Sequence, residues 1–138
     1  MLQSVSKSFF HLLAGSRTLQ RFASRFGMRK PSSFARRFVA GETIDEAIAA
    51  ALAIHERGLP LTLDHLGENV TNLTEAGAAT REYLEIIQAI VQSGIDRNIS
   101  LKLTGLGLDV DKASAVDNLR KILERAEPAG FFVRLDME

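Results

Sequence analysis

Four charged residues lie near the carboxyl ends of three short apolar segments: Asp64, Lys102, Arg134 and Asp136. A cationic lysine in such a place can hold a substrate carboxylate, whereas a desolvated lysine can act as a Schiff-base nucleophile. An aspartate beside Lys102 would stabilise the ammonium form and therefore favours carboxylate binding. The alternative is a satisfied ion-pair network that only braces the fold. These residues predict a polar site, but their types alone do not identify the reaction.

The segments that carry these charges alternate apolar and polar residues and are separated by amphipathic helical stretches. Strand-helix-strand spacing of this kind predicts parallel pairing with right-handed crossovers, and hence the α/β class. A doubly wound sheet would be apolar on both faces, so the single polar face favours a barrel with its site at the strand carboxyl ends. Three strands cannot close a barrel. We therefore expect the N-terminal portion of a longer (β/α)8 TIM-like barrel, with strands over residues 61–65, 99–103 and 131–135.

Three helices are expected to cover these strands. The first begins at the capping box Thr43-Ile-Asp-Glu46 and ends at Gly58. The second runs from about Leu73 to Ser93, and the third ends at Pro128 and Gly130. The inner faces predicted from apolar spacing are Ala79, Tyr83, Ile86, Ile87, Ile90 and Val91 on the second helix, and Val116, Leu119, Ile122, Leu123 and Ala126 on the third.

The charge distribution separates the first 41 residues from the rest. Residues 1–41 hold eight basic residues and no acidic one, whereas residues 42–138 hold nine basic and seventeen acidic residues. We predict a basic N-terminal helical arm over 1–41 and the first βα units over 42–138. The solvated face of a packed helix is the favoured interpretation of the arm, with a membrane-surface helix and a transit peptide as alternatives. No aromatic platform accompanies the charge, so nucleic-acid binding is not expected.

The composition and the short motifs do not support several kinds of site. The chain has no cysteine, which excludes disulfides and thiolate metal ligands. His65 is expected to be packed or hydrogen-bonded, and no metal site is predicted. Gly105-Leu-Gly107 is interpreted as a flexible turn, because a lone GxG is a weak cofactor signal. The longest apolar run, 47–54, is far shorter than the ~20 residues of a membrane span, and a cytoplasmic location is expected.

Four strings in order resemble successive motifs of the bacterial monofunctional proline dehydrogenases. The resemblance spans about residues 36–138 and implies an FAD-bound barrel that oxidises L-proline to 1-pyrroline-5-carboxylate and passes electrons to a membrane quinone. It also implies possible contact of the arm with the inner membrane face. The strings are Phe38-Val-Ala-Gly-Glu-Thr43, Leu63-Asp-His-Leu-Gly-Glu68, Ser100-Leu-Lys-Leu-Thr104 and Val133-Arg-Leu-Asp-Met-Glu138.

The same resemblance implies roles for four residues. Lys102 matches the lysine that helps to hold the substrate carboxylate, and Asp136 matches the catalytic aspartate beside the substrate amine and the flavin. Met137 matches a flavin contact. Glu68 matches a carboxylate that closes the site through an ion pair with an arginine, which in the family would follow Glu138. We therefore expect an incomplete chain that is inactive alone; the other hypotheses are a Schiff-base barrel lyase and a non-catalytic membrane-surface or interaction module.

Overall fold

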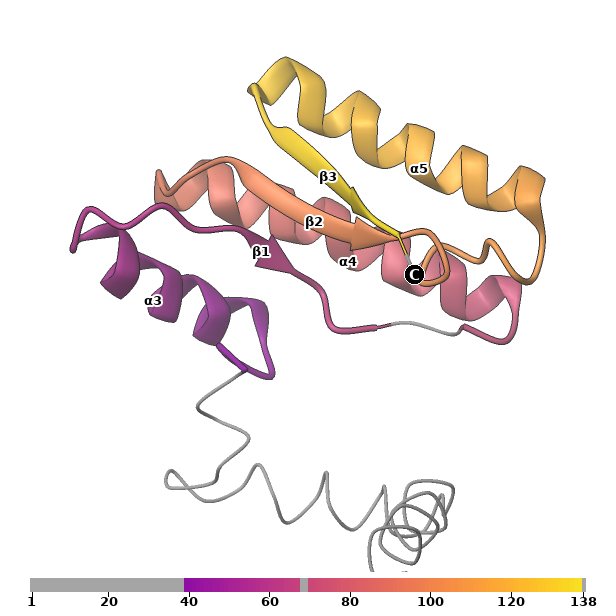
Figure 1. Cartoon of the computed structure of the whole chain (residues 1–138), viewed down its shortest axis with the longest axis horizontal. Helices are drawn as coiled ribbons and strands as arrows, with labels where there is room; N and C mark the ends of the chain where they lie inside the picture. The colour runs from indigo at the N-terminus through magenta and orange to yellow at the C-terminus, as the bar shows by residue number, and fades with distance from the viewer. Residues whose placement is uncertain (1–38, 68–69, 138) are drawn as a thin grey trace, which may run out of the picture. The chain divides into compact units, whose positions relative to one another are not determined.

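The computed structural model describes residues 39–67 and 70–137, and the chain divides between Gly41 and Glu42. Nearly all of the predicted basic arm, and Glu68, lie outside the described residues. Within them, no helix is both long and apolar enough to cross a membrane. The elements are, in order, α3 (Ile44–His55), β1 (Leu63–Asp64), α4 (Leu73–Ser93), β2 (Asn98–Lys102), α5 (Lys112–Ala126), the 3-10 turn η2 (Glu127–Ala129) and β3 (Phe132–Asp136) (Figure 1).

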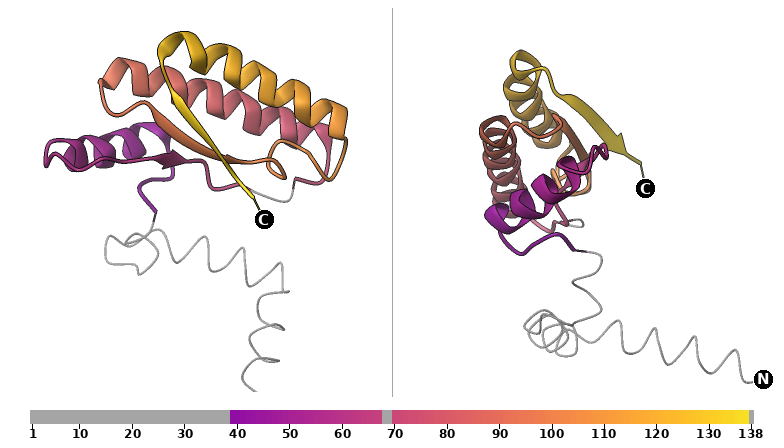
Figure 2. Two further views of the ribbon diagram at one scale, coloured as in Figure 1. Left: turned by 45° about the horizontal axis from the view of Figure 1, so that its top comes forward. Right: turned by 90° about the vertical axis from the view of Figure 1, so that its left-hand side faces the viewer.

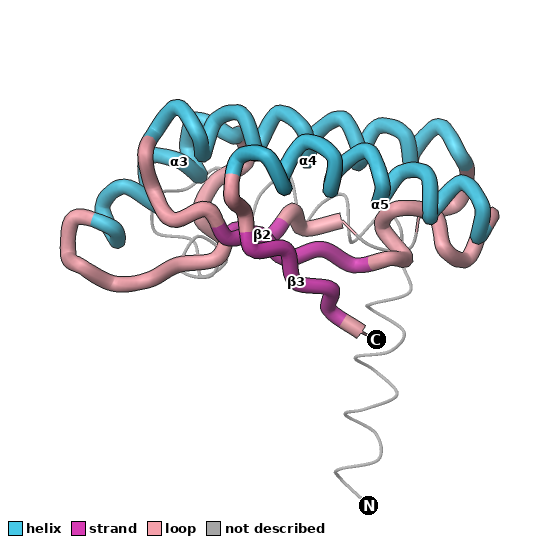
Figure 3. The backbone as a smooth tube through the Cα atoms, turned by 90° about the horizontal axis from the view of Figure 1, so that it is seen from above, coloured by secondary structure: helices cyan, strands magenta, loops and turns pink. Residues whose placement is uncertain are grey.

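The three strands form one parallel sheet in the order β1-β2-β3. Helices α4 and α5 run side by side (Figure 2), and α3, α4 and α5 all lie on the same side of the strands (Figure 3). The predicted α/β class with parallel pairing is confirmed. Helices on one face leave the opposite face of the sheet uncovered by any described helix, as the strand polarity requires.

Strand β1 is shorter than predicted, with two residues in place of five. Side chains form hydrogen bonds with the backbone near both ends of this pairing. Before the strand, the Leu61 amide donates to Asp96 Oδ2 at 3.2 Å. At the end of the pairing, the Ser100 carbonyl oxygen on β2 accepts a hydrogen bond from the Tyr83 hydroxyl at 3.2 Å. Neither contact can be predicted from the local sequence pattern.

The hydrophobic core lies between the sheet and the helices. Ile99 and Leu101 of β2 are fully buried against Ile87 and Ile90 of α4 and Ile122 of α5. The strand residues occupy its apolar alternate positions, and Ile87 and Ile90 lie three residues apart on one face of α4, as expected for amphipathic elements. Since Ile99 and Leu101 point to the helices, the residues that alternate with them point away.

Three inner-face predictions are wrong: Val91, Val116 and Leu123 are 40%, 47% and 40% exposed. Each lies one residue, or about 100° of helix rotation, past a buried position. In α5 the buried stripe consists of Ala115, Asn118, Ile122 and Ala126. Asn118 is accommodated because its side-chain amide donates to the Leu106 carbonyl oxygen at 3.1 Å. Because small and polar residues occupy this buried stripe, the larger Val116 and Leu123 side chains point toward solvent.

The predicted capping box is confirmed, with one difference. The Thr43 hydroxyl accepts from the Glu46 amide at 3.3 Å, and α3 begins at the next residue, Ile44. The Glu46 carboxylate accepts from the Glu42 amide at 2.9 Å, one residue before the usual partner. Side chains therefore satisfy one amide in the first turn of α3 and the amide of the residue before its N-cap.

Glycine at 105 is required by the contact between two loops. A Cβ at this position would lie 2.5 Å from the Gly67 carbonyl oxygen, which belongs to the loop after β1. We expect Gly105→Ala to lower the free energy of unfolding by about 1–3 kcal/mol, because the backbone of one loop must move. The matched control is Gly77→Ala within α4, where the nearest atom is 3.7 Å away and alanine should stabilise the helix by about 0.5–1 kcal/mol.

Urea unfolding of the two variants measures both effects. Equal stability of the Gly105→Ala and Gly77→Ala proteins would contradict the loop contact. The structure also agrees with the interpretation of the Gly105-Leu-Gly107 segment as a turn, since Gly107 has a positive φ of 96° and packs against Ala76.

Candidate active site

The uncovered face of the sheet carries the charged residues that the sequence singled out. The pairing register places Asp64 opposite Ser100, Ser100 opposite Arg134, and Lys102 opposite Asp136. On β2 these residues alternate with the fully buried Ile99 and Leu101, whereas on β3 Val133 is partly buried and Leu135 is 42% exposed. The alternation places the charged residues on the face turned away from the helices. The predicted polar face is confirmed, and it brings Lys102 and Asp136 to neighbouring positions at the strand ends.

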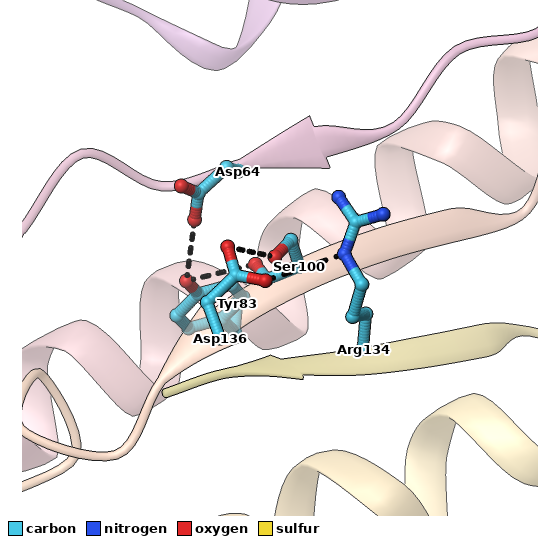
Figure 4. Close-up of polar contacts among 5 residues, drawn as sticks. All are labelled: Asp64, Tyr83, Ser100, Arg134 and Asp136. Atoms are coloured by element: carbon cyan, nitrogen blue, oxygen red, sulfur yellow. Dashed lines mark hydrogen bonds and ion pairs between the residues drawn. The ribbon is translucent and has the colours of Figure 1, made fainter. Parts of the chain in front are cut away.

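Both carboxylate oxygens of Asp136 have partners in the structure (Figure 4). The Ser100 hydroxyl donates to Oδ2 at 2.7 Å, and Arg134 Nε lies 3.3 Å from Oδ1. Ser100 is buried, whereas the side chains of Arg134 and Asp136 are 53% and 39% exposed. Two donors therefore fix the plane of a carboxylate that still reaches solvent.

Tyr83 connects the helix layer to this polar face. Its hydroxyl, which reaches the sheet from α4, lies 3.3 Å from Asp64 Oδ1 and 3.2 Å from the Ser100 carbonyl oxygen. Burial raises the pKa of the Tyr83 hydroxyl, and the nearby Asp64 adds to the shift, so the group stays protonated and donates. Partial desolvation is the main cause that raises the pKa of Asp64, with Asp136 contributing in the same direction.

A depression of about 320 Å³ opens at the ends of β1 and β2 and is lined by Asp64, His65, Leu66, Gly67 and Lys102. Its volume is at the lower end of the range for small-molecule sites. It presents an ammonium group and a carboxylate to the same space, a pairing that suits a zwitterion such as an amino acid.

His65 is packed and paired, as predicted. Its Nε2 forms an ion-pair contact with the Glu82 carboxylate, and its ring meets the edge of Tyr83 with centroids 5.6 Å apart. These contacts connect the loop after β1 to α4. Because this imidazole is already engaged by α4, its visible role is to support the wall of the depression.

Large apolar side chains flank the charged positions. Leu66 and Met137 follow the ends of β1 and β3 and are 83% and 80% exposed. The flavin contact predicted for Met137 stays a prediction, and Glu68, the predicted gate residue, lies outside the described residues.

Two members of the cluster were not identified as site residues from the sequence. Tyr83 was predicted only as part of the inner face of its helix, although a buried tyrosine hydroxyl generally needs a polar partner. Ser100 falls in the alternating segment 99–103 and was given no role. The signal that could have identified it is its spacing, two residues before Lys102 on the same strand face.

Comparison with known proteins adds an independent finding. No family model matches the chain. It is 40% identical over 94% of its length to proline dehydrogenase 1 from Bacillus subtilis subsp. natto, and 34% identical over 80% to the proline dehydrogenase from Deinococcus radiodurans. It spans 42% and 36% of the lengths of these two relatives.

A solved structure supports the same relationship. The crystal structure of proline utilization A (PutA) from Bdellovibrio bacteriovorus, inactivated by N-propargylglycine, matches 75% of this chain and 13% of its own, with a TM-score of 0.66 and 28% identity. Sequence and structure thus agree over most of the chain. The chain is therefore similar in sequence to curated proline dehydrogenases and in structure to a PutA protein, and it spans about two fifths of the length of the Bacillus relative.

Proposed function

We propose that this chain supplies part of a site that oxidises L-proline to 1-pyrroline-5-carboxylate in proline catabolism, with FAD as the hydride acceptor and a quinone as the final electron acceptor. The observation that carries the proposal is the register that places Lys102 opposite Asp136, beside a depression of about 320 Å³ that Lys102 lines. Homology to named proline dehydrogenases supports the choice of substrate.

The sheet belongs, in this proposal, to a (β/α)8 barrel. Three features support it: parallel strands in sequential order, helices on one face of the sheet, and charged residues on the other. In such a barrel the carboxyl ends of the strands surround the active site. Lys102 and Asp136 are the last residues of β2 and β3, so both stand at that rim.

Lys102 and Asp136 would act on opposite ends of proline. The Lys102 ammonium group binds the substrate carboxylate and so fixes the position of the ring. Asp136 accepts a hydrogen bond from the ring nitrogen and orients its lone pair toward the carbon that loses hydride. As hydride leaves that carbon, the lone pair forms the C=N bond, and the N–H proton passes to Asp136 or to water. FAD, when bound, supplies the acceptor for the hydride.

Met137 and Glu68 have secondary roles in the proposal. Met137, the residue after β3, would contact the flavin ring through its exposed side chain. Glu68, four positions after Asp64 in the sequence, would close the site by pairing with an arginine. A cytoplasmic location, with peripheral contact between the basic arm and the inner membrane face, belongs to the same proposal because a membrane quinone must be reached.

A proline oxidation assay tests the proposal. The protein encoded by the complete reading frame that contains these residues is purified with FAD, and quinone reduction is followed with L-proline or D-proline as substrate. We expect L-proline alone to drive reduction and to yield 1-pyrroline-5-carboxylate, which o-aminobenzaldehyde traps as a coloured adduct. A flavin-loaded protein that forms no such product would rule the proposed function out.

A further inference from the structure

The Ser100 side chain is buried at the centre of the polar cluster and holds Asp136 from the neighbouring strand. It is 2% exposed, and the pairing register places it opposite Arg134, not opposite Asp136. Its hydroxyl therefore reaches diagonally across to β3, where it donates to Asp136 Oδ2 at 2.7 Å. Its carbonyl oxygen accepts from the Tyr83 hydroxyl. Contacts in two directions hold this residue in one place.

We infer that Ser100 is a positioning residue that sets the orientation of the Asp136 carboxylate toward the substrate amine. The inference rests on the proposed function. Arg134 also contacts Asp136, but its side chain is 53% exposed, and solvent weakens ion pairs at such positions. The buried hydroxyl makes a short hydrogen bond to a charged group, which is the stronger constraint.

The position of this bond explains why orientation matters. Ser100 and Arg134 each occupy one oxygen of Asp136, which leaves the remaining lone pairs to face the substrate. Without the Ser100 hydroxyl, the carboxylate can rotate about its side-chain bonds and exchange its partner for water. Substrate binding through Lys102 does not depend on this contact. Loss of the hydroxyl should therefore lower kcat and leave KM for proline nearly unchanged.

Three variants of the complete protein test the inference. Ser100→Ala removes the hydroxyl, Ser100→Thr keeps a hydroxyl on a strand-compatible side chain, and Ser93→Ala at the end of α4 is the matched control, since Ser93 bonds only a local carbonyl oxygen at 3.0 Å. We expect Ser100→Ala to lower kcat roughly 10-fold with KM changed less than about 2-fold. Ser100→Thr should recover most of kcat, and Ser93→Ala should match the wild type.

A crystal structure of the Ser100→Ala protein gives a readout that does not require turnover. We expect the Asp136 carboxylate to leave the orientation that it has beside Ser100. An active wild type whose Ser100→Ala variant keeps both its kcat and the Asp136 orientation would overturn the inference. If the wild type itself fails to oxidise proline, the proposed function fails, and the orientation of Asp136 in the variant still decides whether Ser100 positions it.

Discussion

Under the proposed function, Asp136→Asn should lower kcat for proline oxidation by about 100-fold, because the substrate amine would lose a charged hydrogen-bond acceptor at the reacting nitrogen. The substitution is nearly isosteric. The amide oxygen can face Arg134 Nε, and the amide nitrogen can donate to the Ser100 hydroxyl oxygen, but the hydroxyl proton then loses Asp136 as its acceptor. An unchanged melting temperature would show that the loss of kcat reports the charge of Asp136 and not a change in its surroundings.

Steady-state kinetics of the complete, flavin-loaded protein provide the measurement, and thermal melting shows whether the fold is kept. The matched control is Asp117→Asn on α5, where the carboxylate pairs with Arg120 at 2.7 Å and both side chains are 60% exposed. We expect the control to retain wild-type kinetics. A value of kcat for Asp136→Asn within about 3-fold of the wild type would show that this carboxylate has no part in the chemical step.

The polar face of the sheet could be predicted from the sequence because it depends on a simple geometric rule. Side chains alternate along a strand, so the apolar partners of Asp64, Lys102 and Asp136 had to face the helices, and the charges had to face the other way. The structure confirms this arrangement. Their assembly into one cluster follows from parallel pairing, which aligns the carboxyl ends of neighbouring strands.

The contacts within the cluster could not be predicted in the same way. The Ser100 hydroxyl reaches Asp136 only because the register offsets the two residues by one diagonal step, and register is not visible in a single strand. Tyr83 reaches Asp64 from α4, which lies on the helix-covered side of the sheet. The inner face of α5 was predicted only in part because Ala115 and Asn118 lie in its buried stripe. In each case a tertiary contact decided the outcome against the local pattern.

Lys102→Met should lower kcat/KM for L-proline by about 10- to 100-fold, mostly through a higher KM. Methionine keeps much of the length and apolar surface of lysine, but it cannot form a charge-assisted hydrogen bond with the substrate carboxylate. In the proposed mechanism that bond is present before and during hydride loss, so its removal would weaken binding of the substrate and of the transition state alike. The matched control is Lys121→Met on the exposed surface of α5, for which no change in KM is expected.

Lys102→Arg separates carboxylate binding from the chemistry of a Schiff-base lysine. Arginine retains the charge and can bind a carboxylate with two hydrogen bonds, so the variant should keep a KM between those of the wild type and Lys102→Met. A guanidinium group cannot form the covalent adduct that a lyase needs. Activity that survives in Lys102→Arg, together with no borohydride-trapped adduct on the wild-type protein, would exclude the lyase. Complete loss in Lys102→Arg with a trapped adduct on Lys102 would instead show that the lysine is a nucleophile.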